Sequence, residues 1–219
     1  MIARMPADHN IDHMKFLLDL RQRGIMDAAV LRAMEEVPRD KFVMPAQARS
    51  AYADRAMPIP CGQTISQPYV VAYMTEQLEV QPQHHVLEVG TGSGYQAAIL
   101  SRLAAKVTSI ERYRTLADAA RIRLKALRYD NVDIIVGDGM AGAPDRAPFD
   151  RIIVTAAAEA IPQALVDQLA VGGIMVLPLG PHDSHQALVK LVRIEDGVAQ
   201  TELIDVRFVP LLPGQAREL

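Results

Sequence analysis

The chain has 219 residues, a length that suits one α/β domain, and half of its residues are apolar, so it can form a sizeable buried core. Its 23 lysines and arginines stand against 26 acidic residues, a net charge of −3 that argues against nucleic acid as the main partner. The sequence contains no run of about 18 apolar residues, so no transmembrane helix is predicted. Cys61 is the single cysteine, so an internal disulfide is excluded. We expect a cytoplasmic monomer without a secretory leader or a membrane partner.

The first 80 residues are predicted to be helical, with one long loop. Leucines at helical spacing predict a first helix, which Gly24 interrupts. Asp27 is a suitable N-cap for a second helix over residues 28–36. Prolines and a glycine predict a loop over residues 55–67, and a third helix is expected from residue 68 to about residue 78.

From residue 81 onward, short apolar runs alternate with helical segments. Such alternation implies βαβ units and a mostly parallel sheet. The predicted strands cover residues 86–89, 107–110, 132–136, 151–155 and 174–177, and the predicted helices cover residues 95–103, 116–127 and 161–169. Gly172 and Gly173 are expected to separate the last of these helices from the last strand.

The C-terminal region has a different pattern. Residues 187–194 and 201–208 flank Glu195, Asp196 and Gly197, a turn sequence that predicts a hairpin. We therefore expect an α/β fold: a doubly wound, mostly parallel Rossmann-like sheet with an antiparallel C-terminal edge and an N-terminal helical cap. The whole chain, 1–219, is expected to be one domain, with the cap and a substrate loop in residues 1–80 and a cofactor-binding core in residues 81–219.

The first predicted strand of the core ends in the glycines Gly90, Gly92 and Gly94. Ligands of open α/β sheets bind at this end of the strands, and glycine lets the backbone approach them closely. The spacing G-x-G-x-G differs from the G-x-G-x-x-G of dinucleotide binders. Glu88, just before the glycines, suits a ligand ammonium group better than a pyrophosphate. The segment thus favours S-adenosylmethionine over NAD.

Two further acidic residues follow the next two strands. Glu111 lies 19 positions beyond Gly92, where a carboxylate can accept the protons of both ribose hydroxyls, as it also does in NAD binders. Asp138 follows the next strand, where it can accept a hydrogen bond from the adenine amino group. Each feature has a simpler alternative: a tight turn at the glycines, a surface ion pair of Glu111 with Arg112, and a turn-forming role for Asp138.

Several segments resemble the protein-L-isoaspartate O-methyltransferase family, in order and over nearly the whole chain. The most specific of them is Gly62-Gln63-Thr64-Ile65-Ser66-Gln67-Pro68, near the end of the predicted loop. The others are residues 37–43, 87–95, 136–139, 147–150, 154–157, 172–173, 177–180 and 207–211. The chain is similar to bacterial members of the family.

This resemblance implies a repair enzyme for proteins and peptides that contain isoaspartyl residues. The family methylates the free α-carboxylate of L-isoaspartyl residues, with D-aspartyl residues as a further candidate substrate, and the ester then collapses to a succinimide that partly reopens to aspartate. By resemblance, Ser66 is the active-site serine, and no metal is involved. The cofactor contacts implied by the resemblance are Gln63, Thr64, Ile65, Ser66, Glu88, Gly90, Thr91, Gly92, Glu111, Asp138 and Gly139. Tyr69 departs from the pattern, since some relatives have histidine there.

Other residues near these motifs have structural explanations. Ser66 precedes Pro68 and can act as an N-cap of the following helix, a role compatible with a catalytic one. Cys61 is expected to be a buried, inert thiol because no histidine partner is evident. The pair His84 and His85 is expected to face solvent, and His182 and His185 lack zinc-site spacing.

The implied reaction needs no general base, because an α-carboxyl with a pKa of about 3.5 is already ionised at neutral pH. The protein must align the reactants and exclude water, and Ser66 is expected to orient the carboxylate. Three alternatives compete with this prediction: a methyltransferase for a small metabolite or RNA, a non-catalytic S-adenosylmethionine-binding module, and a dehydrogenase. The segment around Ser66 argues against the first two, and comparing NAD with S-adenosylmethionine binding would test the third.

Overall fold

The computed structural model describes residues 7–216, so both ends of the expected 1–219 domain, residues 1–6 and 217–219, lie outside the described residues. The elements at the N-terminal end are α1 (Ala7–Gln22), α2 (Ala28–Glu36), the 3₁₀ turns η1 (Arg39–Lys41) and η2 (Pro45–Ser50), and α3 (Pro68–Gln77). Within the described residues, none of the helices has both the length and the apolarity that a bilayer crossing requires.

The predicted cap of α2 is confirmed. The Asp27 carboxylate accepts hydrogen bonds from the backbone N–H groups of Ala29 at 2.8 Å and Val30 at 3.0 Å. These bonds satisfy two of the free amides at the start of the helix.

Residues 55–67, predicted as a loop, contain a two-stranded antiparallel hairpin, so this prediction is wrong in part. Its strands are β1 (Met57–Pro58) and β2 (Thr64–Ile65). Residues 60–63 form its turn, in which the Gln63 N–H donates to the Pro60 carbonyl at 3.3 Å. The proline and glycine therefore mark the turn of a hairpin whose strands, at two residues each, are too short for a periodic pattern.

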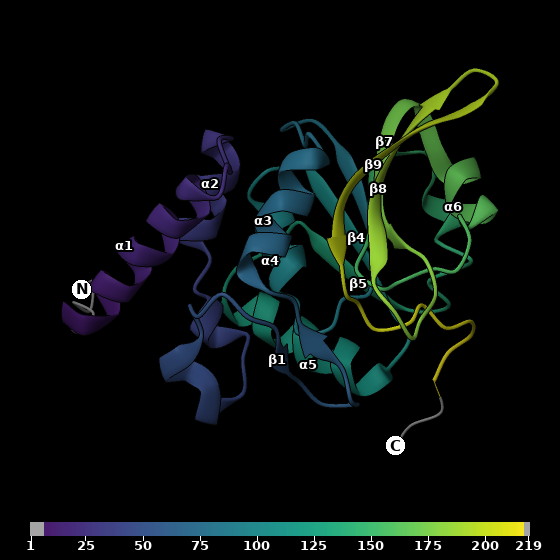
Figure 1. The fold of residues 1–219 in the computed structure, drawn as a ribbon. Coiled ribbons are helices and arrows are strands. Elements are labelled where there is room, and N and C mark those ends of the chain that lie inside the picture. The colour runs from purple at the N-terminus through teal and green to yellow at the C-terminus, as the bar shows by residue number, and fades with distance from the viewer. Residues whose placement is uncertain (1–6, 217–219) are drawn as a thin grey trace.

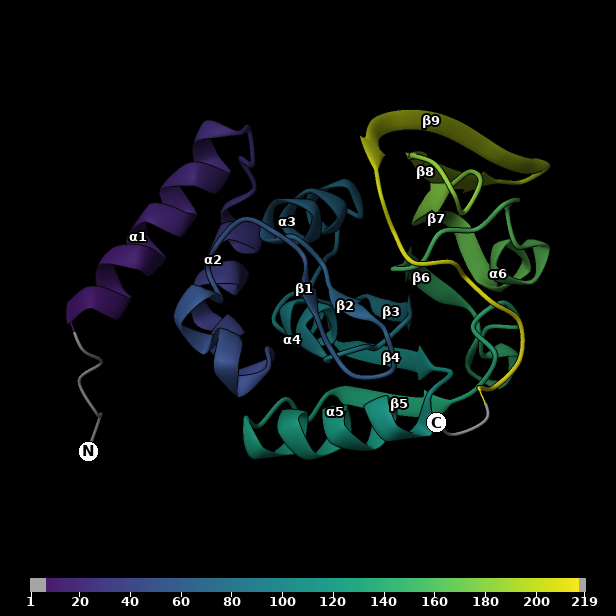
Figure 2. The same ribbon diagram turned by 60° about the horizontal axis from the view of Figure 1, so that its bottom comes forward.

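A seven-stranded sheet forms the centre of the molecule (Figures 1 and 2), in the order β5-β4-β3-β6-β7-β8-β9. Its strands are β3 (His85–Val89), β4 (Lys106–Glu111), β5 (Val132–Val136), β6 (Phe149–Val154), β7 (Leu169–Leu179), β8 (Gln186–Ile194) and β9 (Gly197–Val206). The ladders from β5 to β7 are parallel, and β8 is antiparallel to both of its neighbours. The doubly wound sheet with an antiparallel C-terminal edge is confirmed.

Helices cover both faces of this sheet: α4 (Tyr95–Ser101), α5 (Arg114–Ala126), α6 (Gln163–Gln168) and the short η3 (Pro144–Arg146) follow the strands of the core. Alternation along β3 sends Val86 into a buried cluster with residues of α3 and α4, and Leu87 into another with residues of α6. Phe16 of α1 and Met34 of α2 share a third cluster with Tyr95 of α4. The N-terminal helices thus pack on the core as the predicted cap.

The strand β7 begins earlier than predicted, and Gly172 and Gly173 lie inside it. Pairing with β6 shifts register between Phe149 and Arg151, so the residues around the glycines form an irregular stretch of the ladder. A Cβ on Gly173 would lie 2.7 Å from the backbone oxygen of Ala170. Gly173 therefore allows a close approach within the strand, and neither glycine ends an element.

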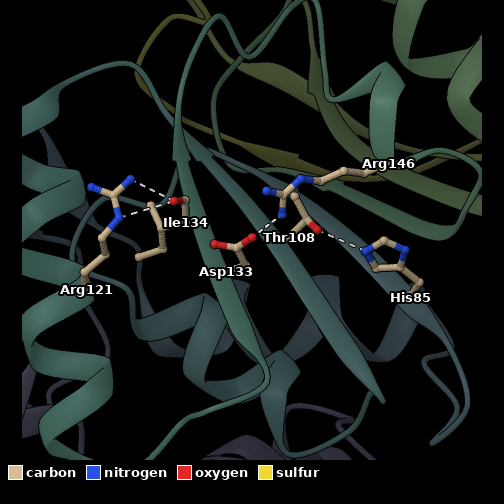
Figure 3. A network of polar contacts seen from close by, with 6 residues as sticks. All are labelled: His85, Thr108, Arg121, Asp133, Ile134 and Arg146. Atoms are coloured by element: carbon tan, nitrogen blue, oxygen red, sulfur yellow. Dashed lines mark hydrogen bonds and ion pairs between the residues drawn. The ribbon is translucent and has the colours of Figure 1, made fainter.

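A polar network lies at the amino-terminal ends of β3, β4 and β5 (Figure 3). Arg121 of α5 donates from Nε and Nη2 to the Ile134 carbonyl at 3.2 and 2.7 Å, and Arg146 of η3 forms an ion pair with Asp133. These contacts attach the outermost parallel strand, β5, to the segments that pack on either side of it.

His85 belongs to the same network, so the prediction that it faces solvent is wrong. Its side chain is half-buried, with Nε2 3.0 Å from the Thr108 hydroxyl oxygen and the ring centroid 4.7 Å from that of Phe149. Within residues 7–216, no three histidine, cysteine, aspartate or glutamate side chains are grouped so as to hold a metal ion.

Candidate functional site

Six of the predicted cofactor residues line a crevice at the carboxyl-terminal ends of β3 and β4. Its walls come from the β1–β2 hairpin, the ends of β3, β4 and β6, and a C-terminal strap that we define as residues 209–212. The lining residues are Gln63, Thr64, Val89, Gly90, Gly92, Ile110, Glu111, Arg112, Tyr113, Gly139, Thr155, Ala156, Val209, Pro210, Leu211 and Leu212. The crevice encloses about 70 Å³, so a ligand as large as a nucleoside requires side chains in its walls to move.

Gly90 needs to be glycine at the floor of this crevice. Its φ is +99°, and an added Cβ would lie 2.3 Å from the Thr155 hydroxyl oxygen. That hydroxyl donates to the carbonyl oxygens of Gly90 at 2.7 Å and Val89 at 3.0 Å, while the Gly90 N–H donates to Ile110. Thr155 of the β6 end and the β4 end thus hold the glycine segment from both sides.

The Glu111 carboxylate faces the crevice and is held by backbone amides. It accepts from the N–H of Gly92 at 2.8 Å and of Tyr113 at 2.9 Å. Burial raises its pKa, and these hydrogen bonds act in the opposite direction. Within the described residues it forms no ion pair with Arg112, whose guanidinium lies 5.3 Å from the centroid of the Tyr113 ring. The alternative explanation of Glu111, a surface ion pair with Arg112, is therefore wrong.

Glu88 does not line the crevice. It points to the same face of β3 as Val86, is 0% exposed, and accepts a hydrogen bond from the Ser109 hydroxyl. Burial raises the pKa of Glu88 to about 8. Val89, on the opposite face of β3, lines the crevice, and the expected contact of Glu88 with a ligand ammonium group stays a prediction.

The buried carboxyl instead supports the glycine segment from behind. The Ser109 oxygen that donates to Glu88 lies 2.5 Å from the Thr91 hydroxyl oxygen, and Thr91 is 3% exposed. Thr91, predicted as a cofactor contact, therefore lies in a buried chain of three polar side chains.

Asp138 and Gly139 differ in their relation to the crevice. Asp138 accepts from the Met140 N–H at 2.9 Å, which is the turn-forming role considered as its alternative, and its side chain is not among those that line the crevice. Gly139 lines the crevice, and a Cβ there would lie 2.5 Å from Cγ1 of Val89. The backbone at this strand end is therefore in close contact with the floor of the site.

A second, larger cavity of about 560 Å³ adjoins the first. Thr64, Thr155 and Val209 line both cavities, so the two meet at these three residues. The second cavity is lined by Ala56, Thr64, Ser66, Gln67, Val70, Thr155, His185, Asp205, Val206, Arg207, Phe208 and Val209. Ser66 thus lines the cavity that adjoins the glycine segment across these shared residues.

Ser66 is not the N-cap of α3, so that prediction is wrong. Gln67 occupies the cap position without a side-chain cap bond, and the Asp54 carboxylate accepts from the Tyr69 N–H at 2.9 Å instead. No partner of the Ser66 hydroxyl occurs among the described residues. Tyr69 stacks under the Arg23 guanidinium, 3.5 Å from the ring centroid. The capping function is supplied from a distance, which leaves the serine hydroxyl available.

The remaining hairpin residues have separate roles. Gln63 and Thr64 line the crevice, whereas Ile65 is 4% exposed and belongs to the core cluster. Cys61 is half-buried at φ +60°, so its expected full burial is wrong. Burial and the nearby Glu111 raise the pKa of its thiol, which fits the expected inertness.

Sequence reasoning assigned no role to Thr155, to the C-terminal strap or to His185. Thr155 is the last residue of a predicted strand, at the end where ligands of such sheets bind, and that position was an available signal. The strap is attached at Ala157, whose N–H donates to Val209 at 2.8 Å and whose carbonyl accepts from Leu211 at 2.7 Å. No local pattern in the sequence predicts that pairing, because it joins segments about 50 residues apart.

Comparisons with known proteins give one consistent result. Residues 11–216 match the family described as Protein-L-isoaspartate(D-aspartate) O-methyltransferase (PCMT). The chain is 58% identical over 208 residues to a protein-L-isoaspartate O-methyltransferase of Rhodopseudomonas palustris (strain BisB18), covering 95% of this chain and 96% of the relative. Identity to a protein of the same name from Bradyrhizobium sp. (strain BTAi1) is 59% over 215 residues, covering 98% and 100%.

Two solved structures are similar in fold as well as in sequence. One, named protein-L-isoaspartate O-methyltransferase, gives a TM-score of 0.81 at 27% identity and covers 90% of this chain and 65% of that chain. The other, provisionally given the same name, is from Plasmodium falciparum and is in complex with S-adenosyl-L-homocysteine. Its TM-score is 0.80 at 29% identity, covering 91% and 98%.

Proposed function

Because the chain belongs to the protein-L-isoaspartate(D-aspartate) O-methyltransferase family, we propose that its two adjoining cavities bind S-adenosylmethionine and an isoaspartyl residue, and that methyl transfer takes place where they meet. The chain is a repair methyltransferase that uses S-adenosylmethionine, and its acceptor is the free α-carboxylate of L-isoaspartyl residues in proteins and peptides. The assignment of individual residues to the two cavities is the proposal.

The crevice fits the cofactor at the points that the structure defines. Gly90 and Gly139 leave space that a Cβ would fill, and Glu111 presents a carboxylate whose position two amides hold. Glu111 accepts hydrogen bonds from the ribose hydroxyls, and Gln63 and Thr64 cover the opposite wall. When bound, the cofactor supplies an activated methyl group on a sulfonium.

Ser66 binds the acceptor. Its hydroxyl, without a partner among the described residues, lines the second cavity and donates a hydrogen bond to the α-carboxylate of the isoaspartyl residue. The carboxylate is ionised at neutral pH, so no side chain has to remove a proton during the transfer. Donation to one oxygen fixes the direction from which the other oxygen attacks.

The remaining contribution of the protein is alignment and exclusion of water. Holding two reactants in line replaces a bimolecular encounter and can lower a barrier by roughly 7–11 kcal/mol. The shared threonines lie where the cavities join, and Thr155 is itself fixed by the backbone of the glycine segment. The observation that carries this proposal is the junction of the two cavities at Thr64 and Thr155, next to Ser66.

Methyl transfer to matched peptides tests the proposal. Labelled S-adenosylmethionine is supplied with an isoaspartyl peptide, its aspartyl twin, and a D-aspartyl version, and initial transfer is followed because the ester hydrolyses in alkali. We expect transfer to the isoaspartyl peptide and almost none to the aspartyl twin. Equal rates on these two peptides would contradict the acceptor assignment, and the D-aspartyl arm measures the breadth of the site.

We propose that the chain acts as a monomer folded as one domain, since its N-terminal helices share a buried cluster with α4 of the core. Light scattering that gives the mass of one chain, with full activity, is the expected result. We propose the cytoplasm as the compartment, since Cys61 offers no internal disulfide for an oxidising one.

A further inference from the structure

Arg39 is a fully buried charged side chain next to the acceptor cavity. Its exposed fraction is 0%, and its guanidinium carbon lies 4.8 Å from the centroid of the Tyr95 ring. Nε donates to the carbonyl oxygen of Ala51 at 2.8 Å, and Nη2 donates to the carbonyl oxygen of Ser66 at 2.8 Å. One side chain thus connects two segments that are 15 positions apart, and one of the two is the proposed acceptor-binding serine.

No ion pair explains this arrangement. Burial lowers the pKa of the guanidinium, and within residues 7–216 no carboxylate lies at ion-pair distance from it. Replacing buried charges with apolar residues of similar volume is often neutral or stabilising. A planar guanidinium that makes two directed hydrogen bonds contributes geometry above all.

The geometry concerns Ser66 in particular. On one side, Arg39 holds the Ser66 carbonyl. On the other side, Asp54 accepts from the Tyr69 N–H at 2.9 Å and from Nε2 of Gln67 at 2.7 Å. The backbone at the serine is therefore held from both directions, and its hydroxyl is left to the cavity.

We infer that Arg39 is a positioning residue for methyl transfer: it holds the Ser66 backbone so that the hydroxyl is aimed at the acceptor carboxylate. Arg39 does not touch the acceptor and acts only through Ser66. This inference rests on the proposed function of the acceptor cavity. It assigns Arg39 no part in binding S-adenosylmethionine.

The test uses Arg39→Lys, which keeps the positive charge but cannot bridge two carbonyls in fixed planar geometry. Arg121→Lys is the matched control, because Arg121 also donates from Nε and Nη2 to a backbone carbonyl, that of Ile134, at the far end of the strands (Figure 3). Transfer to an isoaspartyl peptide is measured at saturating S-adenosylmethionine, which stabilises any folded variant by mass action. Calorimetry gives the affinity for S-adenosyl-L-homocysteine.

We expect Arg39→Lys to lower kcat/KM for the peptide about tenfold or more, the order expected for a hydrogen bond to a charged group, with unchanged affinity for S-adenosyl-L-homocysteine. Arg121→Lys should leave both quantities unchanged. The decisive comparison repeats Arg39→Lys in a Ser66→Ala background. There it should have little further effect, since the hydroxyl that it positions is gone.

Three results would overturn the inference. One is the same fold-loss for Arg39→Lys in both backgrounds, and another is a lower Tm with kcat/KM unchanged. The third is a variant that stays unfolded even with S-adenosylmethionine while Arg121→Lys folds, since Arg39 would then serve the fold itself. Failure of the wild type to prefer the isoaspartyl peptide would instead contradict the proposed function.

Discussion

The buried carboxyl of Glu88 makes stability depend on pH in a direction that can be worked out. An acid whose pKa is raised on folding, here from 4.5 to about 8, favours folding of the protonated form and opposes folding once ionised. The difference of 3.5 units corresponds to about 5 kcal/mol at 1.36 kcal/mol per unit, an upper bound because the folded state can relax. This destabilisation is absent below pH 4.5, grows between pH 4.5 and 8, and is complete above pH 8.

Glu88→Gln removes the ionisation and keeps the shape of the side chain. Its amide oxygen can still accept from Ser109, while the amide nitrogen takes the place of Oε1, which has no partner among the described residues. At pH 5 the variant should be within about 1–3 kcal/mol of the wild type, the cost of one unsatisfied polar group. By pH 8 it should be the more stable of the two.

Urea unfolding at pH 5, 6, 7 and 8 measures this difference, with Glu35→Gln on the exposed side of α2 as the control for losing one negative charge. The gap between Glu88→Gln and the wild type should widen steadily with pH, and the control curve should stay parallel to the wild type. Parallel curves for Glu88→Gln as well would mean that the carboxyl is already ionised in the fold, and the reasoning about its burial would fail.

Four further predictions follow from the two cavities. Ser66→Ala should lower kcat/KM for an isoaspartyl peptide about 10- to 150-fold and leave Tm unchanged, because Asp54 caps α3; a lower Tm with full turnover would restore the capping role. Glu111→Ala should weaken S-adenosylmethionine binding by a similar factor in calorimetry, and unchanged affinity in a folded variant would remove it from the site. Thr155→Val should weaken cofactor binding about fivefold, since the glycine segment loses a hydroxyl that holds it; titration against the wild type decides. The log of kcat/KM should be nearly level from about pH 6 to 8; a slope near pH 6.5 that disappears in His185→Asn would mean that His185 acts as a base.

The sheet was predictable from sequence because its strands are buried on both faces. Residues 86–89 and 107–110 begin and end with apolar residues and alternate with helical segments, which predicts strands at the centre of an α/β sheet. In the structure all of these side chains are buried, the polar ones included. The start of β7 was not predictable in this way. Its first residues include Gly172 and Gly173, and two adjacent glycines predict the end of an element. Only the pairing with β6 shows that the chain continues there as an irregular strand.

The candidate site was located by strand ends and by motif resemblance, but the orientation of its side chains was not. Glu88 and Glu111 both lie at or next to the end of a strand in the cofactor-binding core, so sequence position alone treats them alike. In the structure Glu111 lines the crevice, whereas Glu88 faces Ser109 in the core. Glu88 pairs with Ser109, and Glu111 lies two residues beyond Ser109 on the same face of the sheet. Depth along the strands therefore distinguishes the two glutamates, and it is known only after the register is known to the residue.

Ser66 illustrates the same limit at a helix start. Serine two positions before the first helical residue is an ordinary cap candidate, and nothing within the segment argues otherwise. The role passes to Asp54 because a carboxylate 15 positions away reaches the Tyr69 amide. Arg39, still farther away in sequence, holds the serine carbonyl. Because Asp54 supplies the cap and Arg39 holds the carbonyl, the Ser66 hydroxyl is available to a ligand. The chemistry of Ser66 thus depends on residues that no local motif contains.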